Sequence, residues 1–203
     1  QREDMRYGNP NGVNIRFLFK QDSSGRSVVD TEFIEMLAGF GLEQLSLPLE
    51  SRNVEIMNKY ASGKYDPDNM DTLAVVRELK KVGIQLEGGF MIGFRDETWE
   101  SVLRTKEFAR QVRAEGMDRV GFMIPVPYPG SLDFENVVMS DPALREDFDN
   151  NLLRYTDRMH TRQLPLFDTV VPGEKLVEAQ HDFWLELNDY EYTKTKLLEN
   201  VTP

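Results

Sequence analysis

The segment that decides the fold is residues 85–98, which read QLEGGFMIGFRDET. It opens with an apolar run that is rich in β-forming side chains, and a polar turn follows. This pattern predicts a buried strand over residues 85–94. The three glycines in it, Gly88, Gly89 and Gly93, are unusual, because glycine weakens a strand and more often marks the close approach of a ligand or another backbone.

Apolar runs of the same kind lie on both sides of this segment and alternate with longer amphipathic stretches. Four strands are predicted, at residues 13–19, 44–49, 85–94 and 119–125. Helices are predicted from about residue 31 to residue 39 or 41, and over residues 54–60, 70–82 and 98–113. Such alternation is typical of a parallel sheet, which either curls into a barrel or spreads into a doubly wound sheet, and four strands cannot close a barrel.

Beyond residue 130 the pattern changes to helices, predicted over residues 142–160 and 173–198. The chain is therefore divided into a β/α part, residues 1–135, and a helical C-terminal extension, residues 136–203. The extension carries an apolar stripe that is more typical of core packing than of a cofactor site. Its members are Leu176, Phe183, Trp184, Leu187 and Tyr190.

Composition narrows the possible functions. The 203 residues are 40% apolar, enough for a sizeable core, and their net charge of −11 disfavours nucleic acid and anionic membranes as partners. No apolar stretch approaches the roughly 20 residues that span a bilayer, so a cytoplasmic protein is expected. The chain has no cysteine, which excludes disulfides and cysteine-ligated clusters within it. His160 and His181 are too far apart for a helical metal site, and no metal ligands are predicted.

Candidate functional residues follow the predicted strands, at the end where β/α folds bind ligands. Glu50 and Ser51 come directly after one strand, where a carboxylate can accept hydrogen bonds from a ribose diol or act as an acid or base; alternatively, the pair caps the next helix. Gly89 and Gly93 would let a flat aromatic ligand lie against the backbone; alternatively, they form a bend before a helix cap at residues 96–98.

In order and spacing these segments resemble the radical S-adenosylmethionine (radical SAM) superfamily. The resemblance covers residues 13–131 and depends on Glu50-Ser51, IMNK at 56–59, FMIGF at 90–94 with Glu97-Thr98, and PYPGS at 127–131. It implies an α/β fold, an incomplete (β/α) barrel of about four parallel strands followed by a helical segment. The similarity is greatest to members that also carry a cobalamin-binding domain.

The resemblance also implies roles for individual residues. Seven of them would hold SAM: Glu50 or Ser51 its ribose, Lys59 its carboxylate, and Met91, Gly93, Ile124 and Pro125 its adenine. One departure is Arg95-Asp96, where the superfamily usually has Pro-Gly, so the loop after the third strand is expected to differ in shape.

A larger departure concerns the Cys-x3-Cys-x2-Cys motif, whose thiolates hold the [4Fe–4S] cluster that cleaves SAM in this superfamily. The chain has no counterpart of it. We therefore interpret the chain as the C-terminal part of a larger radical SAM enzyme that acts on a small molecule, with cobalamin-dependent methyl transfer as one implied reaction. Alone, the chain is expected to be inactive. A clusterless member of the superfamily is the alternative to truncation.

Two other functions compete with this interpretation. One is a different β/α-barrel enzyme with Glu50 as general base. The other is a non-catalytic module whose helical extension binds a protein. If two strands are missing, residues 13–19 form an exposed apolar edge strand, which predicts shielding by self-association, by the N-terminal segment or by the helical extension. Lysine at Phe17 or Leu18 is then expected to disturb the chain more than lysine at Gln111.

Overall fold

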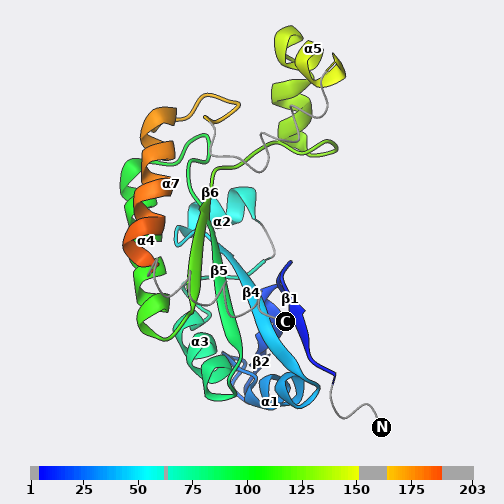
Figure 1. Ribbon diagram of the computed structural model, residues 1–203, viewed down its shortest axis with the longest axis vertical. Helices are drawn as coiled ribbons and strands as arrows, with labels where there is room; N and C mark the ends of the chain where they lie inside the picture. Colours follow the sequence, from blue (N-terminus) through cyan, green and yellow to red (C-terminus); the bar gives the residue numbers. More distant parts are fainter. Residues whose placement is uncertain (1–4, 62–63, 151–163, 189–203) are drawn as a thin grey trace, which may run out of the picture.

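The computed structural model describes residues 5–61, 64–150 and 164–188. Its centre is a four-stranded parallel sheet in the order β1-β4-β5-β6, as predicted for sequential β/α units (Figure 1). The strands are β1 (Tyr7–Asn9), β4 (Leu42–Glu50), β5 (Gln85–Met91) and β6 (Arg119–Met123). The sheet and its helices form part of a β/α barrel.

The prediction for the first strand was wrong. Residues 15–18 form a short 3-10 helix, η1 (Ile15–Leu18), in which Ile15 and Leu18 are buried and Phe17 is 66% exposed. The apolar residues sit three apart, which suits one helical turn better than the alternation of a strand. The parallel strand that precedes β4 is β1, whose Gly8 and Asn9 are weak β formers and gave no strand signal.

A two-stranded antiparallel ribbon follows η1. It pairs β2 (Phe19–Gln21) with β3 (Ser27–Val29). The turn between them is closed by Asp22, whose carboxylate accepts hydrogen bonds from the N–H groups of Ser24 and Arg26. The ribbon is separate from the parallel sheet, so no antiparallel pairing occurs among the four parallel strands.

The helices predicted before residue 115 are confirmed, with ends that differ by at most two residues. Each begins after a side chain that accepts a hydrogen bond from the first turn: Asp30, Asn53, Asp71 and Thr98. The helices are α1 (Thr31–Gly39), α2 (Val54–Tyr60), α3 (Thr72–Lys81) and α4 (Trp99–Ala114).

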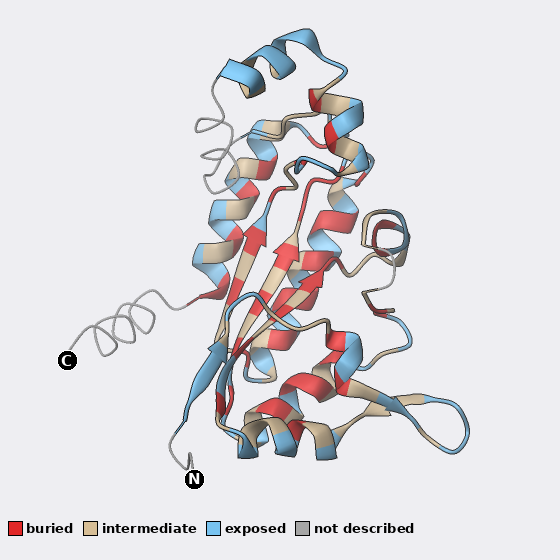
Figure 2. Ribbon diagram, turned by 90° about the vertical axis from the view of Figure 1, so that its right-hand side faces the viewer, coloured by how far each residue is buried: buried red, intermediate tan, exposed pale blue. Residues whose placement is uncertain are grey.

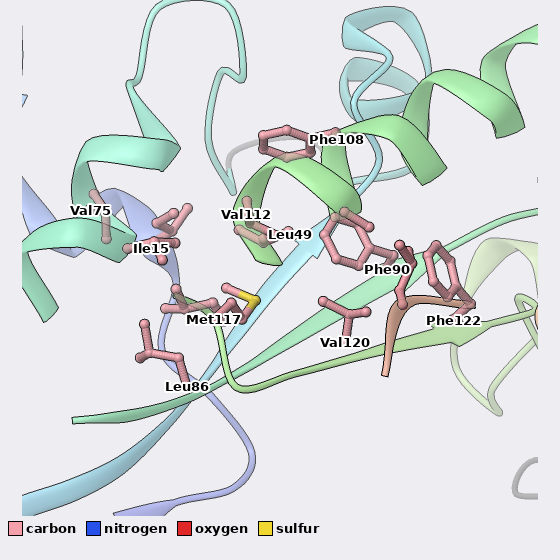
Figure 3. Close-up of a cluster of buried hydrophobic side chains, with 14 of the residues drawn as sticks. Ile15, Leu49, Val75, Leu86, Phe90, Phe108, Val112, Met117, Val120 and Phe122 are labelled. Atoms are coloured by element: carbon pink, nitrogen blue, oxygen red, sulfur yellow. The ribbon is translucent and has the colours of Figure 1, made fainter. Parts of the chain in front are cut away.

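The main core lies between one face of the sheet and the helices. Alternate strand residues are buried there, as the red bands on the strands show in Figure 2. Phe90 is fully buried and stacks on Phe122, with ring centroids 5.5 Å apart, while Phe108 of α4 meets it edge-on at 6.0 Å (Figure 3). Gly88 makes room for Met117, because a Cβ atom at this position would lie 2.4 Å from the sulfur.

The C-terminal part contributes to two cores. Helix α7 (Gly173–Leu187) packs on β6, and its Leu176 and Phe183 belong to the main core, as expected for a packing stripe. A second small core joins a π-helix, η2 (Phe134–Val138), to α5 (Pro142–Asn150), and this unit projects beyond the strand ends in Figure 1. His160, Tyr190 and the predicted continuations of both helices lie outside the described residues; the domain boundary at 135/136 stays a prediction.

The corrected assignment of η1 separates two substitutions that the edge-strand prediction grouped together. Phe17→Lys should change the free energy of unfolding by no more than about 0.5 kcal/mol, because its side chain is exposed. Leu18→Lys should lower it by roughly 3–5 kcal/mol, because a charge would replace a fully buried side chain. Urea denaturation of both variants tests this, and equal losses would restore the edge-strand interpretation.

Candidate functional site

The predicted site residues converge on one rim of the sheet. Strands β4, β5 and β6 are parallel, so Glu50, Gly93 and Pro125 all lie at the carboxyl ends of neighbouring strands. This confirms the expectation of a common rim. The contacts of each residue show what that rim offers.

Glu50 is the strained residue of the rim. Its backbone has a φ of 56°, a left-handed conformation that a non-glycine residue adopts only when its surroundings enforce it. The residue is only 6% exposed, and its carboxylate pairs with the Lys64 ammonium. Tyr65 fixes the same loop, because its hydroxyl donates a hydrogen bond to the Leu49 carbonyl at 2.8 Å, and burial raises the pKa of this phenol far above its ordinary value. The result is a carboxylate held at the strand end beside a cation.

Ser51 lies one residue further and is fully buried. Its hydroxyl accepts a hydrogen bond from the Asn53 N–H at 3.1 Å and lies 3.3 Å from the Thr105 hydroxyl. Asn53, and not the pair Glu50-Ser51, caps α2 by accepting a hydrogen bond from Glu55. The capping alternative for the pair is therefore wrong. Ser51 links the loop to α4 instead.

Glu97 organises the turn after β5, a role that the sequence analysis missed. Its carboxylate accepts hydrogen bonds from Gly93 N–H at 2.8 Å, Phe94 N–H at 3.3 Å and the Ser101 hydroxyl at 2.8 Å. The residue is 1% exposed, and this burial raises its pKa above the usual range of a glutamic acid, against the lowering effect of the three donors. An acidic residue next to a helix cap carries no distinctive sequence signal.

Gly93 serves packing as well as this turn. Its φ of +89° is left-handed, and a Cβ atom there would lie 2.5 Å from Leu176 Cδ1 of α7. The glycine signal at positions 88 and 93 is thus explained by neighbouring side chains. Gly89 is different, because it lies on the face opposite the helices, between Pro48 and Gly121 on the adjacent strands.

Lys59 is tied to the loop after β5. Its ammonium lies 2.5 Å from the Asp96 carboxylate, which also accepts a hydrogen bond from the Tyr60 hydroxyl at 2.5 Å. The hydrogen bond from Lys59 holds the pKa of Asp96 below its usual range, and the same contact raises the pKa of Lys59. Tyr60 stacks on Phe94 at 4.7 Å, so α2 and the β5 loop are joined across the rim.

The end of β6 offers main-chain groups. Met91 is half-buried on β5, and its neighbour Ile92 donates a hydrogen bond to the Met123 carbonyl at 2.9 Å. Ile124 is buried, and its backbone N–H and C=O make no hydrogen bond within the described part of the chain. Pro125 has no N–H to offer. This strand end can therefore pair with the polar edge of a ring.

Within the described residues, no three histidine or carboxylate side chains lie together in a group that could hold a metal ion. The acidic segment 66–71 is structural, since Asp71 caps α3 and Asp66 accepts hydrogen bonds from the N–H groups of Asp68 and Asn69. None of the described helices is long and apolar enough to span a bilayer.

The packing at Gly93 predicts a position-specific cost. Gly93→Ala should lower the free energy of unfolding by roughly 2–4 kcal/mol, because it adds left-handed strain and a clash with Leu176. Gly121→Ala is the matched control, with nothing within 4 Å of the added methyl group, and should stay within about 1 kcal/mol of wild type. Chemical denaturation that ranks the two alike would contradict this account of the turn.

The buried acid predicts a pH dependence. Because the folded pKa of Glu97 is raised above the unfolded value of 4.5, the folded state retains a proton that the unfolded state has lost. The stability of the wild type relative to Glu97→Gln should therefore fall as pH rises through 4.5 and level off above the folded pKa. Urea unfolding of both proteins from pH 4 to 8 measures this difference. A difference that rises with pH would mean that the three hydrogen bonds outweigh burial.

Comparison with known proteins gives two relatives that are both named methyltransferases. "Uncharacterized methyltransferase PH0819" from Pyrococcus horikoshii is 28% identical over 145 residues, which cover 71% of this chain and 29% of that protein. "Bacteriochlorophyllide d C-12(1)-methyltransferase" from Chlorobaculum tepidum is 32% identical over 147 residues, 72% of this chain and 29% of that protein. The chain thus spans about 29% of the length of these relatives. No family model matches it.

The solved structures that are similar to the chain include radical SAM enzymes, the superfamily that its motifs resemble. The radical SAM methyltransferase TsrM from Kitasatospora setae, with cobalamin and a [4Fe-4S] cluster bound, is 21% identical, with a TM-score of 0.45. The similarity covers 55% of this chain and 21% of TsrM.

Proposed function

We propose that this chain is the nucleoside-binding part of a radical SAM methyltransferase. The observation that carries the proposal is the convergence of Glu50, Gly93 and Ile124 at one rim, in the order in which the superfamily's SAM-binding motifs occur. Both curated relatives are named methyltransferases and align with more than two thirds of the chain. The names of the relatives support methyl transfer as the reaction, and the residues at the rim support SAM as the ligand.

The residues present fit part of SAM. Glu50 would accept hydrogen bonds from the ribose hydroxyls, since its carboxylate is held at the strand end by Lys64. The backbone N–H and C=O of Ile124, which make no hydrogen bond within the described residues, would meet the edge of the adenine, and the half-buried Met91 would lie beside the ring. Lys59 would reach the carboxylate of the methionine moiety, in competition with Asp96. Gly93 would not donate its N–H to the nucleoside, because this group already donates a hydrogen bond to Glu97.

The same residues do not fit the [4Fe–4S] cluster, because the chain contains no cysteine. In the proposed enzyme the cluster ligands, and any cobalamin, belong to polypeptide outside this sequence. When bound, SAM would supply a methyl group, or a 5′-deoxyadenosyl radical where the cluster donates the one electron that releases methionine. The part of this chain is to orient the nucleoside, and the chain alone is expected to show no turnover.

Binding of nucleosides tests the proposal directly. SAM should bind with a dissociation constant no better than about 1 mM, or roughly 4 kcal/mol, because its strongest anchor, the cluster, is absent. Adenosine should bind as well as SAM, and methionine should not bind measurably. NMR titration of the labelled chain should place the shifted signals at Glu50, Met91 and Ile124.

Two variants make this titration specific. Glu50→Gln should weaken the response to adenosine, because the amide keeps one acceptor oxygen, replaces the other with an NH2 donor and loses the charge. Glu35→Gln, which changes an exposed residue of α1 in the same way, should leave it unchanged. Micromolar binding, or shifts that avoid the rim, would overturn the assignment.

A further inference from the structure

A network of buried hydrogen bonds connects two loops of the rim, the loop after β4 and the turn after β5. Ser51, Glu97, Ser101 and Thr105 belong to it, and each of these four residues is at most 1% exposed. Asn53 joins them through hydrogen bonds to Ser51 and Ser101. Because a buried polar group costs free energy unless it is paired, such a network holds its members in one arrangement.

Ser101, in the first turn of α4, is the junction of this network. Its hydroxyl donates a hydrogen bond to the Glu97 carboxylate at 2.8 Å and accepts one from the side-chain amide of Asn53 at 3.1 Å. Glu97 in turn accepts hydrogen bonds from the N–H groups of Gly93 and Phe94. One buried hydroxyl of α4 therefore joins the loop after β4 to the turn after β5.

The orientation of Asn53 is fixed by its other contacts. Its side-chain oxygen caps α2, because it accepts a hydrogen bond from the Glu55 N–H at 2.9 Å, and this leaves the side-chain nitrogen for Ser101. Its backbone N–H donates to the Ser51 hydroxyl at 3.1 Å. Asn53 thus links the cap of α2 and the end of β4 to the same serine.

A second hydroxyl of α4 holds the residues next to Glu50. Thr105 follows Ser101 by four positions and lies on the same face of the helix. Its hydroxyl accepts a hydrogen bond from the Arg52 N–H at 3.2 Å and lies 3.3 Å from the Ser51 hydroxyl. Residues 51–53 are therefore anchored on α4 directly after Glu50, whose left-handed backbone needs such support.

We propose that Ser101 is a positioning residue of the nucleoside site. It holds the loop of Glu50 and the turn at Gly93 in a fixed relation, so that the ribose acceptor and the adenine-facing groups at Met91 and Ile124 meet one ligand together. The inference rests on the proposed function of the rim. A nucleoside needs both parts of the site in register, whereas adenine alone needs one part.

The same two loops are also linked at the surface. Lys59 and Tyr60 both contact the Asp96 carboxylate at 2.5 Å, and the side chains of Lys59 and Asp96 are 56% and 48% exposed. Exposed ion pairs fix geometry poorly, because water competes for both partners and the side chains are flexible. Lys59 would also exchange Asp96 for the carboxylate of SAM. The buried hydroxyl of Ser101 is the link that stays in place when the ligand binds.

Two variants break this link from opposite sides. Ser101→Ala removes the hydroxyl. Asn53→Ser removes the amide that reaches Ser101 but keeps a side chain that can cap α2. Thr72→Val is the matched control, because it removes a buried hydroxyl of α3 outside the network.

Hydrogen exchange in the full chain tests the coupling without a ligand. Asn53→Ser should speed exchange of the Gly93 and Phe94 amides at least threefold, because Ser101 loses the donor that holds it against Glu97. Ser101→Ala should do the same and should also speed exchange of the Asn53 amide. Thr72→Val should change none of these amides relative to the rest of the sheet. Faster exchange that is confined to residues 51–55 in Asn53→Ser, or that is equal over the whole sheet, would overturn the inference.

Nucleoside binding separates positioning from packing. NMR titration of the wild type should show adenosine binding better than adenine, because Glu50 adds contacts to the ribose. Both variants should weaken adenosine binding at least threefold and change adenine binding less than twofold, and Thr72→Val should leave both ligands unaffected. Equal losses for the two ligands would overturn the positioning role. A wild type that binds neither would overturn the proposed function, and the exchange measurement would then decide whether Ser101 couples the two loops.

Discussion

Close contact between strand β5 and the elements around it is the constraint on which the sheet depends. Phe90 lies between Gly88 of this strand and Gly93 of the turn that follows it. Gly88 leaves space for the Met117 side chain, and Gly93 leaves space for the Leu176 side chain. Because that space exists, Phe90 can be buried completely against Phe108 and Phe122. Burying one such ring contributes about 2–3 kcal/mol, and its ring contacts also fix where α4 and β6 lie relative to β5.

The same constraint reaches the rim through the turn at Gly93. The left-handed backbone there directs two N–H groups to Glu97, and three hydrogen bonds offset part of the cost of burying that carboxyl group. Once the turn is formed, Asp96 faces α2 and pairs with Lys59. Core packing and rim chemistry are therefore properties of one turn, which explains why a segment of fourteen residues carries most of the signal in the sequence.

The sequence predicts those elements whose signals are local. Helix α2 lies where it was predicted, around Val54–Tyr60, because its signal is local, although its cap is Asn53 and not Glu50-Ser51. Strand β1 was missed, since two of its three residues are poor β formers and it is a strand only because β4 lies beside it. The rim at Glu50 could be predicted from strand order alone. The pairing of Glu50 with Lys64 could not, because it depends on how the loop folds back.

The unequal edges of the sheet relate the fold to the proposed site. On the β6 side, Asn188 and Gln180 satisfy the outward backbone groups, so the rim is bounded there by α7. On the β1 side no further strand of the described chain pairs with the sheet. A nucleoside at Glu50, on the strand next to β1, would therefore lie against a sheet that α7 closes on one side and that ends at β1 on the other. Affinity depends on how much of a ligand is enclosed as well as on its polar contacts. Besides the missing cluster, the end of the sheet at β1 is therefore a second reason to expect weak binding by this chain.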